Sequence, residues 1–303
     1  MSSHAEAGNN TNVPLDDDWT CVAFLGDTSG SMCHLDTKEL AQGVTKMIRE
    51  QNDDNRSVIF FGARFSNSYQ LFSDGVDGKD ITITKEDLHP DGMTALVPAF
   101  ARHIRYVGAK LAAMTERRPG KVIFILVSDG EQTMDHLQNR DETDAPFEGS
   151  TGYEKLKELV TEHQDIWNWT FMFLGTNFDS IAVGTQMGIN PTSCMNYHYS
   201  DVGARNVMRM CSQGMTRVYE NAYEGFTDLE RNESQIYDGS LSQTTSGPNY
   251  YPNPNCDGYE VLEDSDFTPA CCEPVVNESV NNEQTDNQPN GYETAEYEST
   301  GFE

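Results

Sequence analysis

Apolar residues in this 303-residue chain form short continuous runs, which alternate with segments whose apolar residues recur every three or four positions. The continuous runs predict strands buried on both faces, and stripes with apolar residues three and four positions apart predict helices. The expected strands are residues 20–26, 57–62, 122–127, 169–174 and roughly 193–199, with 68–72 as a further edge strand. The expected helices are one that carries Leu40, Val44, Met47 and Ile48, and then 94–114, 153–163, 179–187 and 202–219.

This alternation of strands and helices predicts an open α/β sandwich with a mostly parallel sheet and helices on both faces. Only a turn separates segment 68–72 from strand 57–62, so we expect segment 68–72 to be an edge strand next to it. Asp36, followed three residues later by Glu39, marks the start of the first helix.

Composition changes near residue 224. Residues 225–303 hold 17 acidic residues against one basic residue, Arg231, and so carry −16 of the total charge of −29. Their sparse Ile, Leu, Val and Phe cannot bury enough apolar surface to offset the entropy lost on ordering. We therefore expect a flexible N-terminal arm (1–18), an α/β domain (19–222) and a disordered acidic tail rich in Asn, Ser and Tyr (223–303).

The charge balance and the apolar runs exclude several classes of partner. With 49 acidic and 20 basic residues, the chain is not expected to bind nucleic acid directly. Its apolar runs are far shorter than the roughly 20 residues that span a bilayer, so no membrane is expected. The start MSSHAEAGNNTNVPLDDDW lacks the features of a secretory signal, which predicts a cytoplasmic protein. Seven cysteines without CxxC spacing are expected to be reduced thiols.

Three polar loops lie where ligands gather in parallel sheets, beyond the carboxyl ends of strands. They are Gly26-Asp27-Thr28-Ser29-Gly30-Ser31-Met32, Asp91-Gly92-Met93-Thr94 and Ser128-Asp129-Gly130-Glu131. Each sequence taken singly is also consistent with a polar turn or a helix cap. Their occurrence together, at matching strand ends and in the right chain order, favours one shared site.

The chemistry of these loops suits a divalent cation. The candidate ligands supply two carboxylates and three hydroxyls, and are Asp27, Ser29, Ser31, Thr94 and Asp129. Hard oxygen donors favour Mg²⁺ or Mn²⁺ over zinc, and Gly30 lets the backbone fold around a small ion. Because Mg²⁺ takes about six oxygens and retains waters, such a set leaves a position for water or an incoming ligand.

The runs VAFLGDTSGSM, DGMTAL and KVIFILVSDGE together resemble the three-part metal-ion-dependent adhesion site of von Willebrand factor A domains. The resemblance covers residues 19–222 and implies a Rossmann-like sandwich with a short antiparallel edge strand. It implies Ser29, Ser31 and Thr94 as direct ligands, and Asp27 and Asp129 as direct or water-mediated ones. The sequence departs from the family at Met93, where glycine is often found. Segment 173–189 resembles intracellular bacterial, phage or viral A-domain proteins.

A cation held largely by hydroxyls is expected to attract a carboxylate into its open position. We therefore expect a non-enzymatic, cation-dependent protein–protein interaction module whose unidentified partner presents Asp or Glu. The surrounding loops would set its specificity, and include His34, His89, Glu131 and the insertion 141–150.

Two alternatives remain open. One is a structural or regulatory interaction protein that acts through its acidic tail, including self-association in which a tail occupies a neighbour's metal site. The other is a metal-assisted hydrolase, for which no positioned general base stands out in the sequence.

Overall fold

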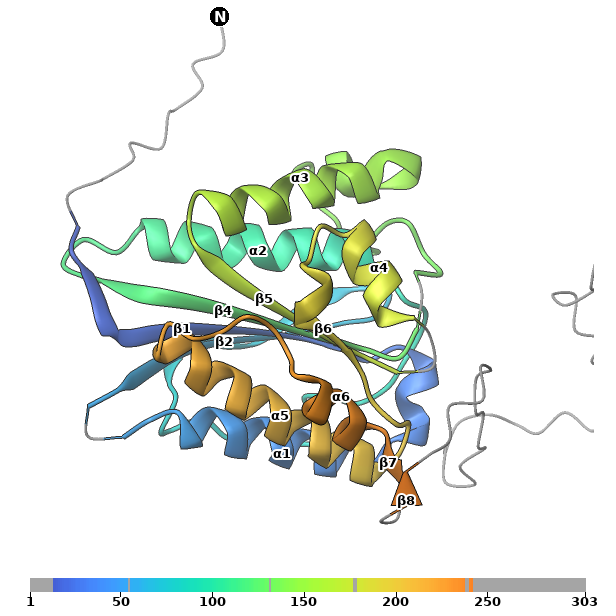
Figure 1. The fold of residues 1–303 in the computed structure, drawn as a ribbon. Coiled ribbons are helices and arrows are strands. Elements are labelled where there is room, and N and C mark those ends of the chain that lie inside the picture. The colour runs from blue at the N-terminus through green and yellow to red at the C-terminus, as the bar shows by residue number, and fades with distance from the viewer. Residues whose placement is uncertain (1–12, 54, 131, 177–178, 238–239, 242–303) are drawn as a thin grey trace, which may run out of the picture. The chain divides into compact units, whose positions relative to one another are not determined.

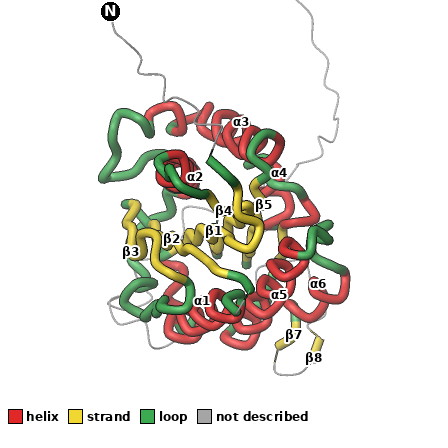
Figure 2. Tube along the Cα trace, turned by 90° about the vertical axis from the view of Figure 1, so that its left-hand side faces the viewer, coloured by secondary structure: helices red, strands yellow, loops and turns green. Residues whose placement is uncertain are grey.

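A six-stranded sheet forms the centre of the domain, in the order β3-β2-β1-β4-β5-β6 (Figure 1, Figure 2). The structure is a computed structural model and describes residues 13–241 apart from 54, 131, 177–178 and 238–239. Neighbouring strands are parallel except for β2 and β3, which are antiparallel. The strands are β1 (Leu15–Asp27), β2 (Ser57–Phe65), β3 (Tyr69–Asp77), β4 (Arg118–Ser128), β5 (Trp169–Gly175) and β6 (Cys194–Asn196). A short antiparallel pair, β7 (Ile236–Tyr237) and β8 (Ser240–Leu241), follows them in the chain.

Helices cover both faces of this sheet (Figure 1). One face is covered by α2 (Leu96–Ala112), α3 (Gly152–Asp165) and α4 (Ser180–Gln186). The other face is covered by α1 (Thr37–Glu50), α5 (Asp201–Tyr219) and α6 (Asp228–Ser234). Short 3-10 turns connect the elements, namely η1 (Gly30–His34), η2 (Ala145–Phe147), η3 (Gly149–Thr151) and η4 (Pro191–Ser193).

Strand β1 shows why the apolar runs are continuous. Alternate residues such as Ala23 and Leu25 pack into the core on the α2 and α3 side, whereas Val22 and Phe24 pack on the α1 and α5 side. All four are fully buried. A strand covered on both faces needs apolar residues at every position. The predicted fold class is therefore confirmed: a Rossmann-like open α/β sandwich, mostly parallel, with one antiparallel edge strand.

The predicted helices and strands are present, with shifted ends. Asp36 begins α1 as expected, and its carboxylate accepts a hydrogen bond from the Lys38 amide at 2.9 Å. Strand β6 ends at Asn196, three residues before the predicted end at 199. The Tyr197 amide still donates to the Gly175 carbonyl at 2.9 Å, after which the chain turns toward α5. Residues 197–200 therefore form a loop beyond the strand end.

The described domain extends past both predicted limits. Strand β1 begins at Leu15, inside the expected flexible arm, and α6 lies inside the expected acidic tail. Phe226 is only 6% exposed, so it anchors the segment that leads into α6. Thr227 and Glu230 then form a capping box at the start of α6. Residues 1–12 and 242–303, which hold most of the expected arm and tail, lie outside the described residues.

Within the described ranges, no helix has the length and apolar character needed to cross a membrane. Cys21, Cys194 and Cys211 are free thiols in buried positions. Cys256, Cys271 and Cys272 lie outside the described residues.

Replacing Glu230 by alanine is expected to lower the free energy of unfolding by about 2–3 kcal/mol, measured by urea denaturation. The carboxylate of Glu230 accepts hydrogen bonds from Arg217 at 2.8 and 2.9 Å and also closes the capping box. Its loss leaves a partly buried guanidinium without its partner. Glu233→Ala is the matched control, because its ion pair with Arg209 is more exposed to water. Equal destabilisation by the two substitutions would contradict an anchoring role for Glu230.

Candidate metal centre

The first and third polar loops begin at the carboxyl ends of β1 and β4, which are neighbours at the centre of the sheet. The strand order reverses here, because β1 connects onward to β2 on one side while β4 lies on the other. Asp27 is the last residue of β1 and Ser128 the last of β4, with Asp129 directly after it. The parallel register, in which Gly26 pairs with Val127, therefore brings the two aspartates to the same end of the sheet.

The first loop folds back on the side chain of Asp27. Oδ1 of Asp27 accepts a hydrogen bond from the amide of Ser29 at 2.8 Å. Both the amide and the hydroxyl of Thr28 donate to the Phe65 carbonyl, at 2.8 and 3.0 Å, which ties the loop to β2. The chain then enters the η1 turn, and the hydroxyl oxygens of Ser29 and Ser31 lie 3.1 Å apart. Two hydroxyls from this loop thus lie side by side.

Each aspartate accepts a hydrogen bond from a serine hydroxyl. Ser128 Oγ donates to Asp27 Oδ2 at 2.6 Å, and Ser31 Oγ donates to Asp129 Oδ1 at 2.8 Å. A hydroxyl that donates its proton to a carboxylate keeps its oxygen lone pairs for another partner, such as a cation. Asp27 is 1% exposed and Asp129 3% exposed, whereas Ser31 is exposed to solvent. The cluster is therefore buried at its base and open on the Ser31 side.

Burial perturbs both carboxylates. It raises the pKa of Asp27 to about 6, against the opposing effect of hydrogen bonds from Ser128 and Ser29. For Asp129, burial and then the negative charge of Asp27 raise the pKa to about 7, while hydrogen bonds from Ser31 and Tyr199 act in the opposite direction. Two like charges that water cannot solvate are costly. A divalent cation between them would compensate both, so the donor set fits such an ion.

The second loop lies against the first. The amide of Asp91 donates to the Thr28 carbonyl at 2.7 Å, and the amide of Gly30 donates to the Gly92 carbonyl at 2.8 Å. Thr94 follows and is buried just before α2.

The structure thus brings four of the five predicted ligands together. Four of them share the hydrogen-bonded cluster of the first and third loops, namely Asp27, Ser29, Ser31 and Asp129. The fifth, Thr94, is carried by the adjoining loop.

Gly92 gives the second loop its shape. Its φ of +74° lies in the left-handed region, and a Cβ atom there would meet the side chain of Asn67 at 2.7 Å. The same Asn67 side chain accepts a hydrogen bond from the amide of Met93. Met93, where the sequence departs from the family pattern, is 48% exposed and needs no glycine conformation. The glycine requirement therefore falls one residue earlier, at Gly92.

The segment after the third loop encloses Thr94. The amides of Thr133 and Met134 donate to the Thr94 carbonyl at 2.9 and 3.0 Å, and the Thr94 amide donates to the Thr133 hydroxyl at 2.9 Å. Both backbone polar groups of Thr94 are therefore engaged by one segment, which restricts where its side chain can lie.

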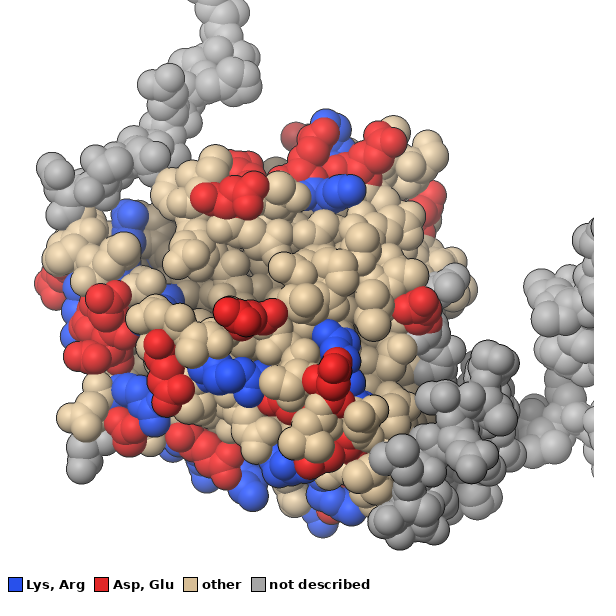
Figure 3. Space-filling view, in the orientation of Figure 1, with Lys and Arg blue, Asp and Glu red and all other residues tan. Residues whose placement is uncertain are grey.

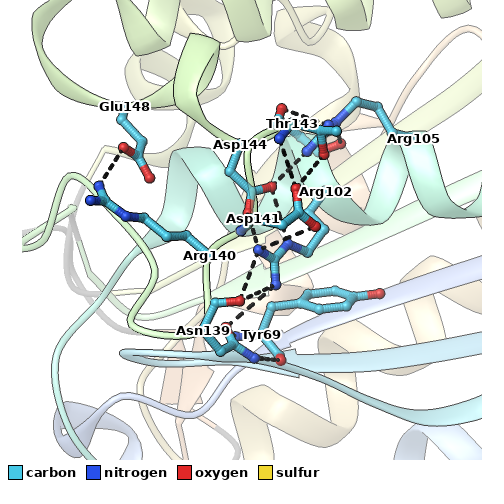
Figure 4. Close-up of polar contacts among 10 residues, drawn as sticks. Tyr69, Arg102, Arg105, Asn139, Arg140, Asp141, Thr143, Asp144 and Glu148 are labelled. Carbon is cyan, nitrogen blue, oxygen red and sulfur yellow. Dashed lines mark hydrogen bonds and ion pairs between the residues drawn. The ribbon is translucent and has the colours of Figure 1, made fainter.

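Further along, Asp144 anchors that segment through contacts with arginines of α2 (Figure 4). Its carboxylate is fully buried. It accepts hydrogen bonds from Arg102 Nε at 3.1 Å and Arg105 Nη2 at 2.7 Å, both on α2. Asn139 donates to the Tyr69 carbonyl at 2.7 Å and so adds a contact with β3. The insertion 141–150, expected to influence specificity, is thus fixed to α2 through Asp144.

Of the other loop residues expected to influence specificity, His89 is exposed to solvent. Glu131 and the side chain of His34 lie outside the described residues. A role in specificity for these positions stays a prediction.

Three residues near the aspartates were not among the predicted ligands: Ser128, Tyr197 and Tyr199. Ser128 belongs to the third loop and donates to Asp27. Tyr199 donates to the Ser31 carbonyl and to Asp129 Oδ2, the latter at 3.3 Å. The sequence feature that could have indicated the two tyrosines is their position after a parallel strand, at the end of the sheet where the other loops lie.

Among the described residues, no group of three or more His, Cys, Asp or Glu side chains is arranged to hold a metal ion. The candidate centre has two such residues and would complete its donor set with hydroxyls, which is the chemistry of the predicted ligands.

No protein-family model and no curated protein matches the chain. Solved structures with a similar fold include von Willebrand factor type A from Catenulispora acidiphila, at 15% identity and a TM-score of 0.40 over 64% of this chain and 42% of that one. The vWF domain of the type V pili tip protein Mfa5 from Porphyromonas gingivalis matches at 12% identity and a TM-score of 0.44, over 68% of this chain and 96% of that one. Proximal thread matrix protein 1 from the mussel byssus, with a zinc-occupied MIDAS motif, matches at 16% identity and a TM-score of 0.42, over 65% of this chain and 46% of that one. This chain spans less than half the length of the first and third of these structures.

Substituting Gly92 by alanine is expected to destabilise the protein by about 1–3 kcal/mol, because alanine tolerates the left-handed region poorly and its Cβ would collide with Asn67. Gly130→Ala, in the third loop, is the matched control, since a Cβ there meets nothing within 4 Å. Its effect should stay within about 0.5 kcal/mol. Thermal and urea unfolding measure both variants, and similar stability for the two would refute the account of the second loop.

Proposed function

We propose that the loop cluster binds one divalent cation, Mg²⁺ or Mn²⁺, and that the chain is a von Willebrand factor A-like interaction module. The observation that carries the proposal is the pair of buried aspartates, Asp27 and Asp129. Serine hydroxyls donate hydrogen bonds to both, so the serine oxygens still have lone pairs that can coordinate a cation. Ser29, Ser31 and Thr94 would be direct ligands. The two aspartates would act directly or through water.

The proposed cation would supply a positive charge that a partner carboxylate can reach. Ser31 lies on the solvent-exposed side of the cluster, so a ligand can approach there. Hydroxyl ligands neutralise less of the ion's charge than carboxylates do, which leaves it attractive to an incoming Asp or Glu. An unidentified protein that presents such a side chain is the partner we propose.

The net charge of the chain sharpens this argument. A protein with a formal charge of −29 repels acidic partners at long range. On the face shown in Figure 3, basic side chains lie among acidic ones. Because the net negative charge opposes the approach of an acidic partner, recognition of a carboxylate would depend on the cation itself. Removing the ion should abolish the interaction rather than weaken it slightly.

We propose binding rather than hydrolysis. In the described part of the chain, the side chains that donate hydrogen bonds to the two aspartates are hydroxyls, from Ser29, Ser31, Ser128 and Tyr199. A hydroxyl orients a carboxylate but is a poor general base near neutral pH. The alternative in which the acidic tail carries the interaction stays a prediction, because residues 242–303 lie outside the described residues.

Calorimetric titration of Mg²⁺ and Mn²⁺ into the metal-stripped protein should show saturable binding at one site. The double variant Asp27→Ala, Ser29→Ala should lose that binding, because it removes a carboxylate and a hydroxyl from the cluster.

A matched double variant, Asp53→Ala with Ser57→Ala, controls for weak binding by the many other acidic residues. Ser57 is the first residue of β2 and Asp53 lies four residues before it, at the opposite end of the strands. Saturable binding retained by the Asp27, Ser29 variant, or absent from the unaltered chain, would rule out the proposed centre.

A further inference from the structure

Tyr199 connects two loops of the candidate centre. It lies in the segment between β6 and α5, far along the chain from both loops. Its hydroxyl donates to the carbonyl of Ser31, 168 residues away, and to Oδ2 of Asp129, 70 residues away. Because Ser31 Oγ donates to the other oxygen of Asp129, both carboxylate oxygens are engaged. The orientation of Asp129 therefore depends on Tyr199 as well as on Ser31.

Tyr197 lies two residues earlier and is buried, with 2% of its surface exposed. Its hydroxyl has no hydrogen-bond partner within the part of the chain that the structure describes. Burial raises the pKa of this hydroxyl, and the negative charges of Asp129 and Asp27 raise it further. The backbone places the residue at the same end of the sheet as the carboxylates: the Tyr197 amide donates to the Gly175 carbonyl at 2.9 Å, and Gly175 pairs in register with Ser128, whose hydroxyl donates to Asp27.

A buried O–H group without an acceptor destabilises a folded protein, and phenylalanine would fill the same space without that cost. No hydrogen bond within the described residues therefore explains the hydroxyl of Tyr197. Beside two carboxylates that would bind a hydrated cation, this hydroxyl has a chemical role. A phenol can donate to a carboxylate and accept from a water at the same time.

We infer that Tyr197 and Tyr199 are positioning residues of the cation centre, which hold the ligand carboxylates from the side of the β6–α5 segment. Tyr199 fixes Asp129 against the first loop. Tyr197 supplies a second hydroxyl to the carboxylate pair once the cation and its waters are bound. Groups that hydrogen-bond metal ligands orient them, and their loss weakens metal binding. The inference rests on the proposed function.

Calorimetric titration of Mn²⁺ into the full chain tests it with Tyr197→Phe and Tyr199→Phe. Each should weaken binding by about 10–100-fold. Tyr219→Phe is the control, since Tyr219 is a buried phenol near the other end of α5, about 27 Å along the helix from its start. Its Mn²⁺ affinity should equal that of the unaltered chain.

Thermal unfolding of the metal-stripped variants separates positioning from structure. Tyr197→Phe should unfold at the same temperature as the unaltered chain or higher, although it binds Mn²⁺ more weakly. Weakened binding accompanied by a lower metal-free unfolding temperature would assign Tyr197 a structural role and overturn its part in the inference.

The binding outcomes distinguish the inference from the proposed function. Unchanged Mn²⁺ affinity in both tyrosine variants, with binding intact in the unaltered chain, would overturn the inference and leave the cation centre standing. Absence of binding by the unaltered chain would overturn both.

Discussion

Repulsion between two buried carboxylates shapes this end of the molecule. Asp27 and Asp129 lie where water scarcely reaches, and the charge of one raises the pKa of the other. The surrounding groups reduce the cost only in part, through donors from Ser128, Ser31 and the Ser29 amide. A site that keeps two like charges close together is poorly explained by stability alone. It is well explained by a doubly positive ligand.

The rest of the fold holds this pair in place. Helices on both faces bury β1 and β4 along their apolar runs, so the strands end at fixed positions and deliver the aspartates to one edge. Around that edge, contacts distant in sequence restrict the loops. Thr133 engages the backbone of Thr94, and Asp144 fixes the following insertion to two arginines of α2. These contacts fix the loops that carry the proposed ligands, and such rigidity would favour tight binding of the proposed cation.

Much of this could be predicted from the sequence. The run around Val22 and Ala23 is apolar at every position, which predicts a strand buried on both faces. Once the strands are placed, the loops after them must share an edge, so Asp27 and Asp129 could be brought together without coordinates. The boundary at residue 222 was harder to place, because the acidic composition concealed the capping box of Thr227 and Glu230. That four-residue signal is local and could have been found.

Other features depend on contacts that sequence patterns do not encode. The partners of Asp144 lie 39 and 42 residues away on α2, and nothing in the spacing pairs them. The apolar pattern predicts a strand that includes Tyr199, whereas β6 ends at Asn196, and the tyrosine lies in the following loop with its hydroxyl bonded to Asp129. Where a short edge strand ends is decided by its neighbours rather than by its own residues.

Anomalous diffraction at the manganese edge, from crystals grown with Mn²⁺, tests the central claim most directly. The account predicts one strong peak among the oxygens of Asp27, Ser29, Ser31 and Asp129, within reach of the Thr94 hydroxyl. A well-ordered domain with no peak at that edge of the sheet, or with its peak elsewhere, would contradict it.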